Sequence, residues 1–297
     1  MRPTEFTARV LFSALPATLC CGLALAPIDA AAQPAPMPSV RAADRAEVAP
    51  LAEALRIEEL MAVMRAEGLA YAIELRDQLF PGEGDARWTA ATREIYAMDA
   101  MTRVMVEGLV HDMSAEDVTA ATRFFESDLG QRIVDLEIAA REGLMEEGVE
   151  EASHDHLDEL PDADPERMKL LEAFIAANDL LEENVVGALN ANLAFFEGLD
   201  AGGAYSEEWS ETGSMYGDLW AQEARIRQET GEWIYSYLAM AYAPLTDSEL
   251  SSYIAFSESD AGIALNTALF GAFDRLYTRI SYDLGRGAAR FIAGDDI

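Results

Sequence analysis

The residues best suited to metal chemistry are His154 and His156, with Glu150, Glu151 and Asp158 close to them in the sequence. Imidazole and carboxylate groups are ligands that zinc accepts, so this segment is a candidate site for a divalent metal. Two histidines two positions apart do not share one face of a helix, and no third ligand follows at a regular spacing. The alternative interpretation is a solvated acidic linker, which the surrounding carboxylates favour.

No catalytic arrangement accompanies this pair. The sequence has no Gly-x-Ser-x-Gly elbow, no His-Glu-x-x-His helix and no phosphate-cradling glycine loop. We therefore predict that the protein is not an enzyme and uses no cofactor. A metal-dependent hydrolase or metal-binding protein that uses His154 and His156 is the alternative.

Two further groups of side chains are candidates for binding. Arginines at spacings of four, seven and four form one basic stripe: Arg275, Arg279, Arg286 and Arg290. This stripe is either a solvated helix face or a surface that docks onto acidic residues of the other half of the chain or of a second subunit, which would make a homo-oligomer. Aromatic residues also gather in one stretch, as helical core or as the lining of a ligand pocket: Trp209, Tyr216, Trp220, Trp233, Tyr235, Tyr237 and Tyr242.

The segments that carry these residues have a helical pattern almost throughout. Apolar residues recur three or four positions apart, and runs of β-branched residues are few. The pattern predicts one helix over about 88–110, a short helix over 114–126, another helix from about 127, and a long helix through 171–196. We therefore predict an all-α fold, organised as a helical bundle.

One motif occurs twice, with an offset of 132 residues: Phe124 to Gly130 returns as Phe256 to Gly262. The offset predicts that the bundle consists of two tandem, related helical repeats. The eight recurring residues are expected to build helix ends: Ser114, Phe124, Ser127, Gly130, Thr246, Phe256, Ser259 and Gly262. The expected divisions are a signal peptide over 1–32, a flexible leader over 33–44, a first repeat over 45–150, an acidic linker over 151–165 and a second repeat over 166–297.

Each of these residue types has a structural use at a helix end. The hydroxyl residue that starts each short helix is followed three positions later by Asp117 or Glu249, an arrangement typical of a capping box, for which aspartate is the shorter and poorer partner. The two later serines are expected to cap the next helix. The glycines either allow another helix to approach closely or end the short helix in a left-handed conformation. The phenylalanines should bury their rings where the helices meet.

The run 113–133 resembles the core of a bacterial secreted family called domain of unknown function 2059. Members carry a helix start with a hydroxyl and an acid, then two aromatics, a serine, a glycine and a Gln-basic pair. The matching residues are Phe124, Phe125, Ser127, Gly130, Gln131 and Arg132. In the second copy Ser257 replaces the second aromatic, and Ile263 and Ala264 replace the Gln-basic pair. The resemblance implies an exported, all-helical, periplasmic protein and no assigned activity.

Composition and the N-terminal sequence limit the kinds of partner that we expect for this protein and indicate its location. A net charge of −33 repels nucleic acid and anionic lipid, so neither is an expected partner. Residues 1–32 have the pattern of an export signal with cleavage near Ala32, so we expect a periplasmic or secreted protein with no transmembrane segment after cleavage. Its expected partner is an unidentified protein or small ligand in the cell envelope.

Overall fold

The structure, a computed structural model, describes residues 43–80, 85–146, 148–204 and 222–292. Every regular element in these ranges is an α-helix, which confirms the all-α helical bundle. None of these helices combines the length and the apolar character that crossing a membrane requires. The predicted signal peptide lies outside the described residues. The helices are α1 (Arg45–Ala54), α2 (Ile57–Leu79), α3 (Asp85–Ile95), α4 (Met98–Asp112), α5 (Ala115–Phe125), α6 (Asp128–Leu144), α7 (Val149–Ala163), α8 (Pro165–Ala177), α9 (Leu180–Ala201), α12 (Glu223–Tyr242), α13 (Asp247–Ser257) and α14 (Asp260–Ile292).

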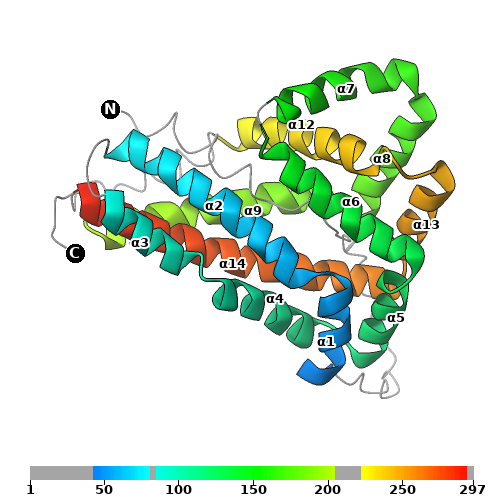
Figure 1. The fold of residues 1–297 in the computed structure, drawn as a ribbon, viewed down its shortest axis with the longest axis horizontal. Coiled ribbons are helices and arrows are strands. Elements are labelled where there is room, and N and C mark those ends of the chain that lie inside the picture. The colour runs from blue at the N-terminus through cyan, green and yellow to red at the C-terminus, as the bar shows by residue number, and fades with distance from the viewer. Residues whose placement is uncertain (1–42, 81–84, 147, 205–221, 293–297) are drawn as a thin grey trace, which may run out of the picture.

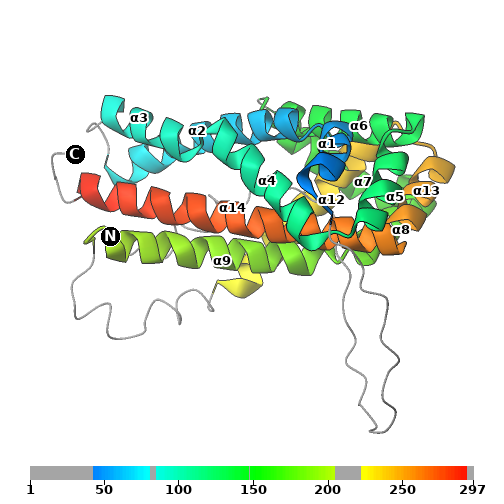
Figure 2. The same cartoon turned by 90° about the horizontal axis from the view of Figure 1, so that it is seen from below.

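The longest helix, α14, is the centre of the bundle. Its 33 residues extend about 50 Å. Figures 1 and 2 show α9 along one side of α14 and the layer of α2, α3 and α4 along the other. Because α4 belongs to the first half of the chain and α9 and α14 belong to the second, the two halves share one hydrophobic core.

Glycines set the distance between α9 and α14. A Cβ atom added at Gly285 would lie 2.1 Å from the carbonyl oxygen of Phe195, and one at Gly198 would lie 2.1 Å from that of Tyr282. Both obstacles are backbone atoms, which cannot rotate away as a side chain could. The two helices are therefore in direct backbone contact at this crossing.

This contact predicts a clear effect of Gly285→Ala. We expect the free energy of unfolding to fall by about 1–3 kcal/mol, because α9 and α14 must separate to admit the methyl group. Denaturant unfolding measures the change. Gly231→Ala on α12 is the matched control, since its added Cβ would meet only the Leu181 side chain at 3.8 Å. Equal effects of the two substitutions would contradict the close backbone contact.

The helix predicted over 88–110 is wrong as one continuous element. The chain breaks between α3 and α4 at Tyr96 and Ala97. The Tyr96 ring turns into the core against Gly68, where an added Cβ would lie 2.2 Å from the ring, and Arg65 donates from Nε to the Tyr96 carbonyl at 2.9 Å. A tertiary contact therefore produces the break, and Arg65 satisfies the carbonyl that the break exposes.

The long helix predicted through 171–196 is also interrupted. Asp179, between α8 and α9, has a left-handed backbone with φ +46°. The preceding Asn178 is fully buried and donates from Nδ2 to the Phe174 carbonyl at 2.8 Å. Neither residue is a glycine or a proline, so the sequence carries no strong break signal at this point.

The acidic segment predicted as a linker forms a helix, α7. It packs against α12 through a side that includes the buried Ser153 and Leu160, and its charged residues face away from the bundle. In Figure 1, α7 forms the upper right edge of the molecule. The segment thus joins the two halves as an ordered element, while the domain boundaries stay predictions.

Candidate binding site at Glu137

The two motif copies build similar helix starts. Thr246 and Glu249 form a complete capping box, in which Thr246 N donates to the Glu249 carboxylate at 2.8 Å and Glu249 N donates to the Thr246 hydroxyl. In the first copy, Asp117 N donates to the Ser114 hydroxyl at 3.1 Å. The Asp117 carboxylate accepts a hydrogen bond from the Ser114 hydroxyl and not from the Ser114 backbone N–H. The shorter aspartate side chain accounts for the missing half of the box.

The next helices also begin alike, and the two copies meet each other. Ser127 and Ser259 each accept a backbone hydrogen bond at 3.1 Å from the glycine three positions on. Neither glycine is left-handed; an added Cβ would instead strike the end of the preceding short helix, so the left-handed alternative is wrong. The Phe124 and Phe256 rings stack with centroids 4.0 Å apart. Motif residues of the two halves are thus in contact, and duplication of the whole unit stays a prediction.

The Gln-basic pair of the first copy ties this motif to other elements. Gln131 donates from Nε2 to the carbonyls of Ala54 and Phe125 at 2.9 and 2.6 Å. Arg132 reaches the second half, where it pairs with Glu249 at 2.6 Å and donates to the Pro244 carbonyl. Both side chains therefore connect the ends of neighbouring helices and stabilise the fold.

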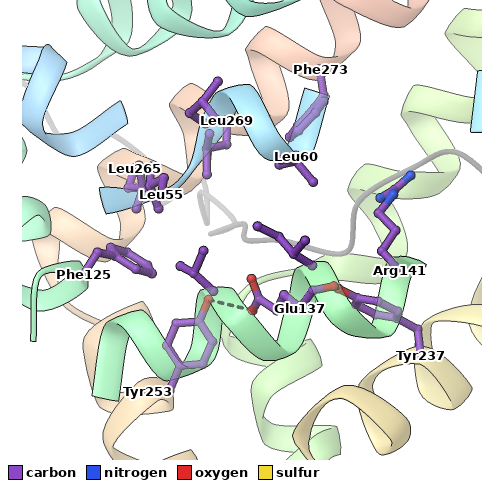
Figure 3. Close-up of a pocket in the computed structure, with 13 residues that line it drawn as sticks. Leu55, Leu60, Phe125, Glu137, Arg141, Tyr237, Tyr253, Leu265, Leu269 and Phe273 are labelled. Carbon is purple, nitrogen blue, oxygen red and sulfur yellow. Dashed lines mark hydrogen bonds between the residues drawn. The ribbon is translucent and has the colours of Figure 1, made fainter. Parts of the chain in front are cut away.

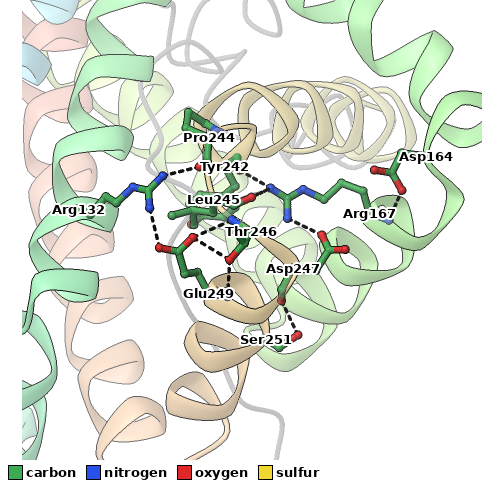
Figure 4. Close-up of polar contacts among 10 residues, drawn as sticks. All are labelled: Arg132, Asp164, Arg167, Tyr242, Pro244, Leu245, Thr246, Asp247, Glu249 and Ser251. Atoms are coloured by element: carbon green, nitrogen blue, oxygen red, sulfur yellow. Dashed lines mark hydrogen bonds and ion pairs between the residues drawn. The ribbon is translucent and has the colours of Figure 1, made fainter.

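A second arginine holds the same turn from the other side. Figure 4 shows Arg132 of α6 and Arg167 of α8 flanking the α12–α13 turn. Arg167 is buried, donates to the carbonyls of Tyr242 and Leu245, and contacts Asp247 at 3.0 Å. The turn that sets the end of α12 and the start of α13 is therefore fixed by two charged side chains.

This fixed turn positions two tyrosines against a carboxyl group of the first half. Tyr242, the last residue of α12, and Tyr253 of α13 both donate from their hydroxyls to Oε1 of Glu137, at 2.7 and 3.2 Å. Tyr237, on α12, donates to the backbone carbonyl of Glu137 at 3.0 Å. One glutamate of α6 thus contacts three tyrosines that lie at least 100 residues away in the sequence.

Glu137 lies at the wall of a small cavity of about 50 Å³. Apart from Glu137, Arg141, Tyr237 and Tyr253, the described lining is aliphatic or phenyl: Leu55, Ile57, Leu60, Phe125, Val134, Ile138, Leu265, Leu269 and Phe273. Figure 3 shows one carboxyl oxygen of Glu137 linked to Tyr253 and the other turned toward the middle of the pocket. This second oxygen forms no hydrogen bond with the residues that the structure describes.

The surroundings change the acidity of Glu137. Glu137 keeps some exposed surface, but its carboxyl group is enclosed by apolar side chains. This burial raises the pKa of Glu137 from its ordinary value of 4.5 to about 7, while the hydrogen bonds from Tyr242 and Tyr253 act in the opposite direction. The group therefore exchanges its proton near neutral pH, in contrast to an exposed glutamate.

One turn further along α6, Arg141 forms a buried ion pair. Its guanidinium contacts both carboxylate oxygens of Glu67 on α2, at 2.7 and 2.8 Å. Only 3% of the Arg141 side chain and 8% of the Glu67 side chain are exposed. Each charge is thus balanced by its partner, and the cavity wall beside Glu137 carries no unpaired cation from Arg141.

The sequence candidates fall into different places. His154 and His156 lie on α7, where His154 is half-buried and His156 is exposed, and no group of three potential metal ligands occurs within the described ranges. In the aromatic stretch, Tyr237 and Tyr242 belong to the Glu137 site, and the Trp233 ring stacks on Tyr237 at 5.2 Å. Trp209, Tyr216 and Trp220 lie outside the described residues. In the arginine stripe, Arg275 pairs with Asp112 of α4 at 3.1 Å.

Sequence reasoning missed Glu137, which reads as one of many acidic residues. A signal did exist, because Gly130, Val134, Glu137 and Arg141 follow one another at spacings of four, three and four. That spacing places a glutamate and an arginine on the same helix face as buried residues, where a charge needs a partner.

Comparison with known families supports the resemblance seen in the motif. Residues 99–159 match the family described as "Uncharacterized protein conserved in bacteria (DUF2059)". The match begins in α4, includes α5 and α6, and ends in α7, so it contains both Glu137 and Arg141. Neither the curated proteins nor the solved structures contain a match to the chain.

Proposed function

We propose that this chain, whose residues 99–159 match the DUF2059 family, is an exported, non-enzymatic binding protein with its ligand site at Glu137. The observation that carries this proposal is the second carboxyl oxygen of Glu137, which lies at the wall of an apolar cavity and has no hydrogen-bond partner among the described residues. A carboxyl group in such surroundings binds a hydrogen-bond donor strongly, because little water competes for it.

The lining of the cavity favours binding over catalysis. Among the described residues that line it, there is no histidine, cysteine, serine or lysine that could act as nucleophile or exchange a proton with Glu137. The tyrosine hydroxyls are engaged with Glu137 itself, and burial raises the pKa of both Tyr242 and Tyr253 well above the ordinary value. The tyrosines therefore remain neutral donors that orient the carboxyl group.

The size of the cavity limits the ligand. A volume of about 50 Å³ is far below the roughly 300–1,000 Å³ of pockets that enclose an organic ligand. The site therefore takes one small donor group, and an ammonium or primary amine complements the carboxylate best. Export is supported by the N-terminal signal pattern, with a periplasmic or secreted location as the expected destination.

Binding of a small amine tests this function. We expect methylammonium to bind the wild-type protein at pH 8, where Glu137 is ionised, and about tenfold more weakly at pH 6, where most of the group is protonated. Isothermal titration calorimetry measures both affinities. Glu137→Gln should remove this binding, because the amide has no charge.

Two controls separate the site from general attraction of cations to a chain of net charge −33. Glu142→Gln removes the same charge from an exposed position on the same helix and should leave binding unchanged. Tetramethylammonium has no N–H donor and should not compete. Equal methylammonium affinity in the wild-type and Glu137→Gln proteins would reject the proposed site.

A further inference from the structure

A groove with arginines along one wall lies between α3 and the C-terminal end of α14. Its volume is about 540 Å³. Arg279, Arg286 and Arg290 line it from α14, and an apolar floor comes from Ile95 and Phe291 among others. This groove contains three of the four arginines in the stripe identified in the sequence, on a chain that is otherwise strongly acidic.

The charges within the groove are only partly balanced. Arg286 pairs with Asp283 at 3.2 Å, and Glu94 also faces the groove. Arg279 and Arg290 have no ion pair with the part of the chain that the structure describes. Among the described residues, the groove therefore has a net positive charge and two guanidinium groups without a carboxylate partner.

Helix α7 carries an acidic stripe with the same geometry. Four exposed acids follow one another at spacings of four, three and four: Glu151, Asp155, Asp158 and Asp162. Four of the groove-lining residues of α14 have the same spacings, and three of these four are arginines: Arg279, Asp283, Arg286 and Arg290. Each stripe is about 16 Å long, since its ends are eleven positions apart along the helix. The acidic stripe lies opposite the packed side of α7, which includes Ser153 and Leu160.

The two stripes cannot meet within one molecule. In Figures 1 and 2, α7 lies toward one end of the long axis, whereas α3 and the C-terminal end of α14 lie at the other. Any contact between them must therefore join two molecules.

We infer that the basic groove between α3 and α14 binds the acidic face of α7 from a second copy of this chain. Three guanidinium groups would face carboxylates at matching intervals, Asp283 keeps its ion pair with Arg286, and the long arginine stems would cover the apolar floor. The contact joins different surfaces of the two molecules, so it repeats head to tail. At about 0.15 M salt the Debye length is about 8 Å. The attraction between charges at this contact is therefore screened less than the repulsion between acidic residues farther apart.

Charge reversal on each side, followed by mixing, tests this contact. The groove variant is Arg286→Glu with Arg290→Glu, and the helix variant is Asp158→Arg with Asp162→Arg. Sedimentation velocity at 0.15 M salt over a range of concentrations measures association of each full-length protein. We expect the wild type to self-associate. The association constant of each variant alone should be lower than that of the wild type by about tenfold or more. An equimolar mixture should associate again, because the unchanged α7 of the groove variant fits the unchanged groove of the helix variant.

A matched control and an independent fold measurement make the outcomes decisive. Glu142→Arg with Glu146→Arg makes the same charge change as the helix variant at two exposed positions, one on α6 and one just after its end, and should associate like the wild type. Circular dichroism melting must show that every variant is folded. A wild type that stays monomeric, or a mixture that does not regain association, would overturn the inference. Neither result would affect the amine site at Glu137, which is tested separately by calorimetry with methylammonium.

Discussion

Glu137→Gln is expected to stabilise the protein at pH 8 and to flatten the dependence of stability on pH. The folded-state pKa of Glu137 is about 7, above the ordinary value of 4.5, so the folded protein holds this proton more tightly than the unfolded chain. Its contribution to stability is therefore full below pH 4.5 and is lost as pH rises through 7. The difference between the folded-state and ordinary pKa values corresponds to a change of about 3 kcal/mol in the free energy of unfolding. Glutamine keeps the acceptor for Tyr242 and Tyr253 and cannot ionise.

Denaturant unfolding at a series of pH values between 4 and 8 measures this effect. The free energy of unfolding of Glu137→Gln minus that of the wild type should grow by about 3 kcal/mol across this interval. Glu142→Gln, one turn away and exposed, is the matched control and should give a nearly constant difference. A constant difference for Glu137→Gln as well would show that the pKa of Glu137 is not raised above its ordinary value.

Arg141→Met is expected to cause the largest loss of stability among the substitutions considered. The methionine removes both hydrogen bonds to Glu67 and leaves a carboxylate inside the protein without its counter-charge. Breaking a buried ion pair from one side costs about 3–5 kcal/mol. Denaturant unfolding at pH 7 provides the measurement.

The partner substitution shows whether the unpaired charge is the cause. Arg141→Met combined with Glu67→Leu should recover most of the stability, because an apolar pair of similar volume often replaces a buried ion pair without loss. Arg123→Met on the exposed face of α5 is the control for removing an arginine. If Arg141→Met were no more harmful than Arg123→Met, the ion pair would contribute little to the fold.

Local signals in the sequence were enough to predict helix type and several helix starts. Ser114, Thr246, Ser127 and Ser259 each stand immediately before a helix in the structure and accept a backbone N–H, because a cap depends on residues within three positions. The arginine stripe was likewise visible in the sequence as a single helix face.

The breaks and the binding site could not be predicted in the same way. Tyr96 interrupts a helical pattern because Gly68, in another helix, offers room for its ring. Glu137 acquires its chemistry from tyrosines 105 and 116 residues away, which only the packing of the two halves brings near. Such features depend on long-range contacts, and short-range periodicity carries no information about them.

The most direct test of the Glu137 site is its own titration. Carbon-13 NMR of protein labelled at glutamate side-chain carboxyls follows each group with pH, and Glu137→Gln identifies the signal by its absence. We predict a midpoint near pH 7 for Glu137. A Glu137 midpoint near the ordinary value of 4.5 would contradict the enclosed carboxyl group on which the proposed binding site depends.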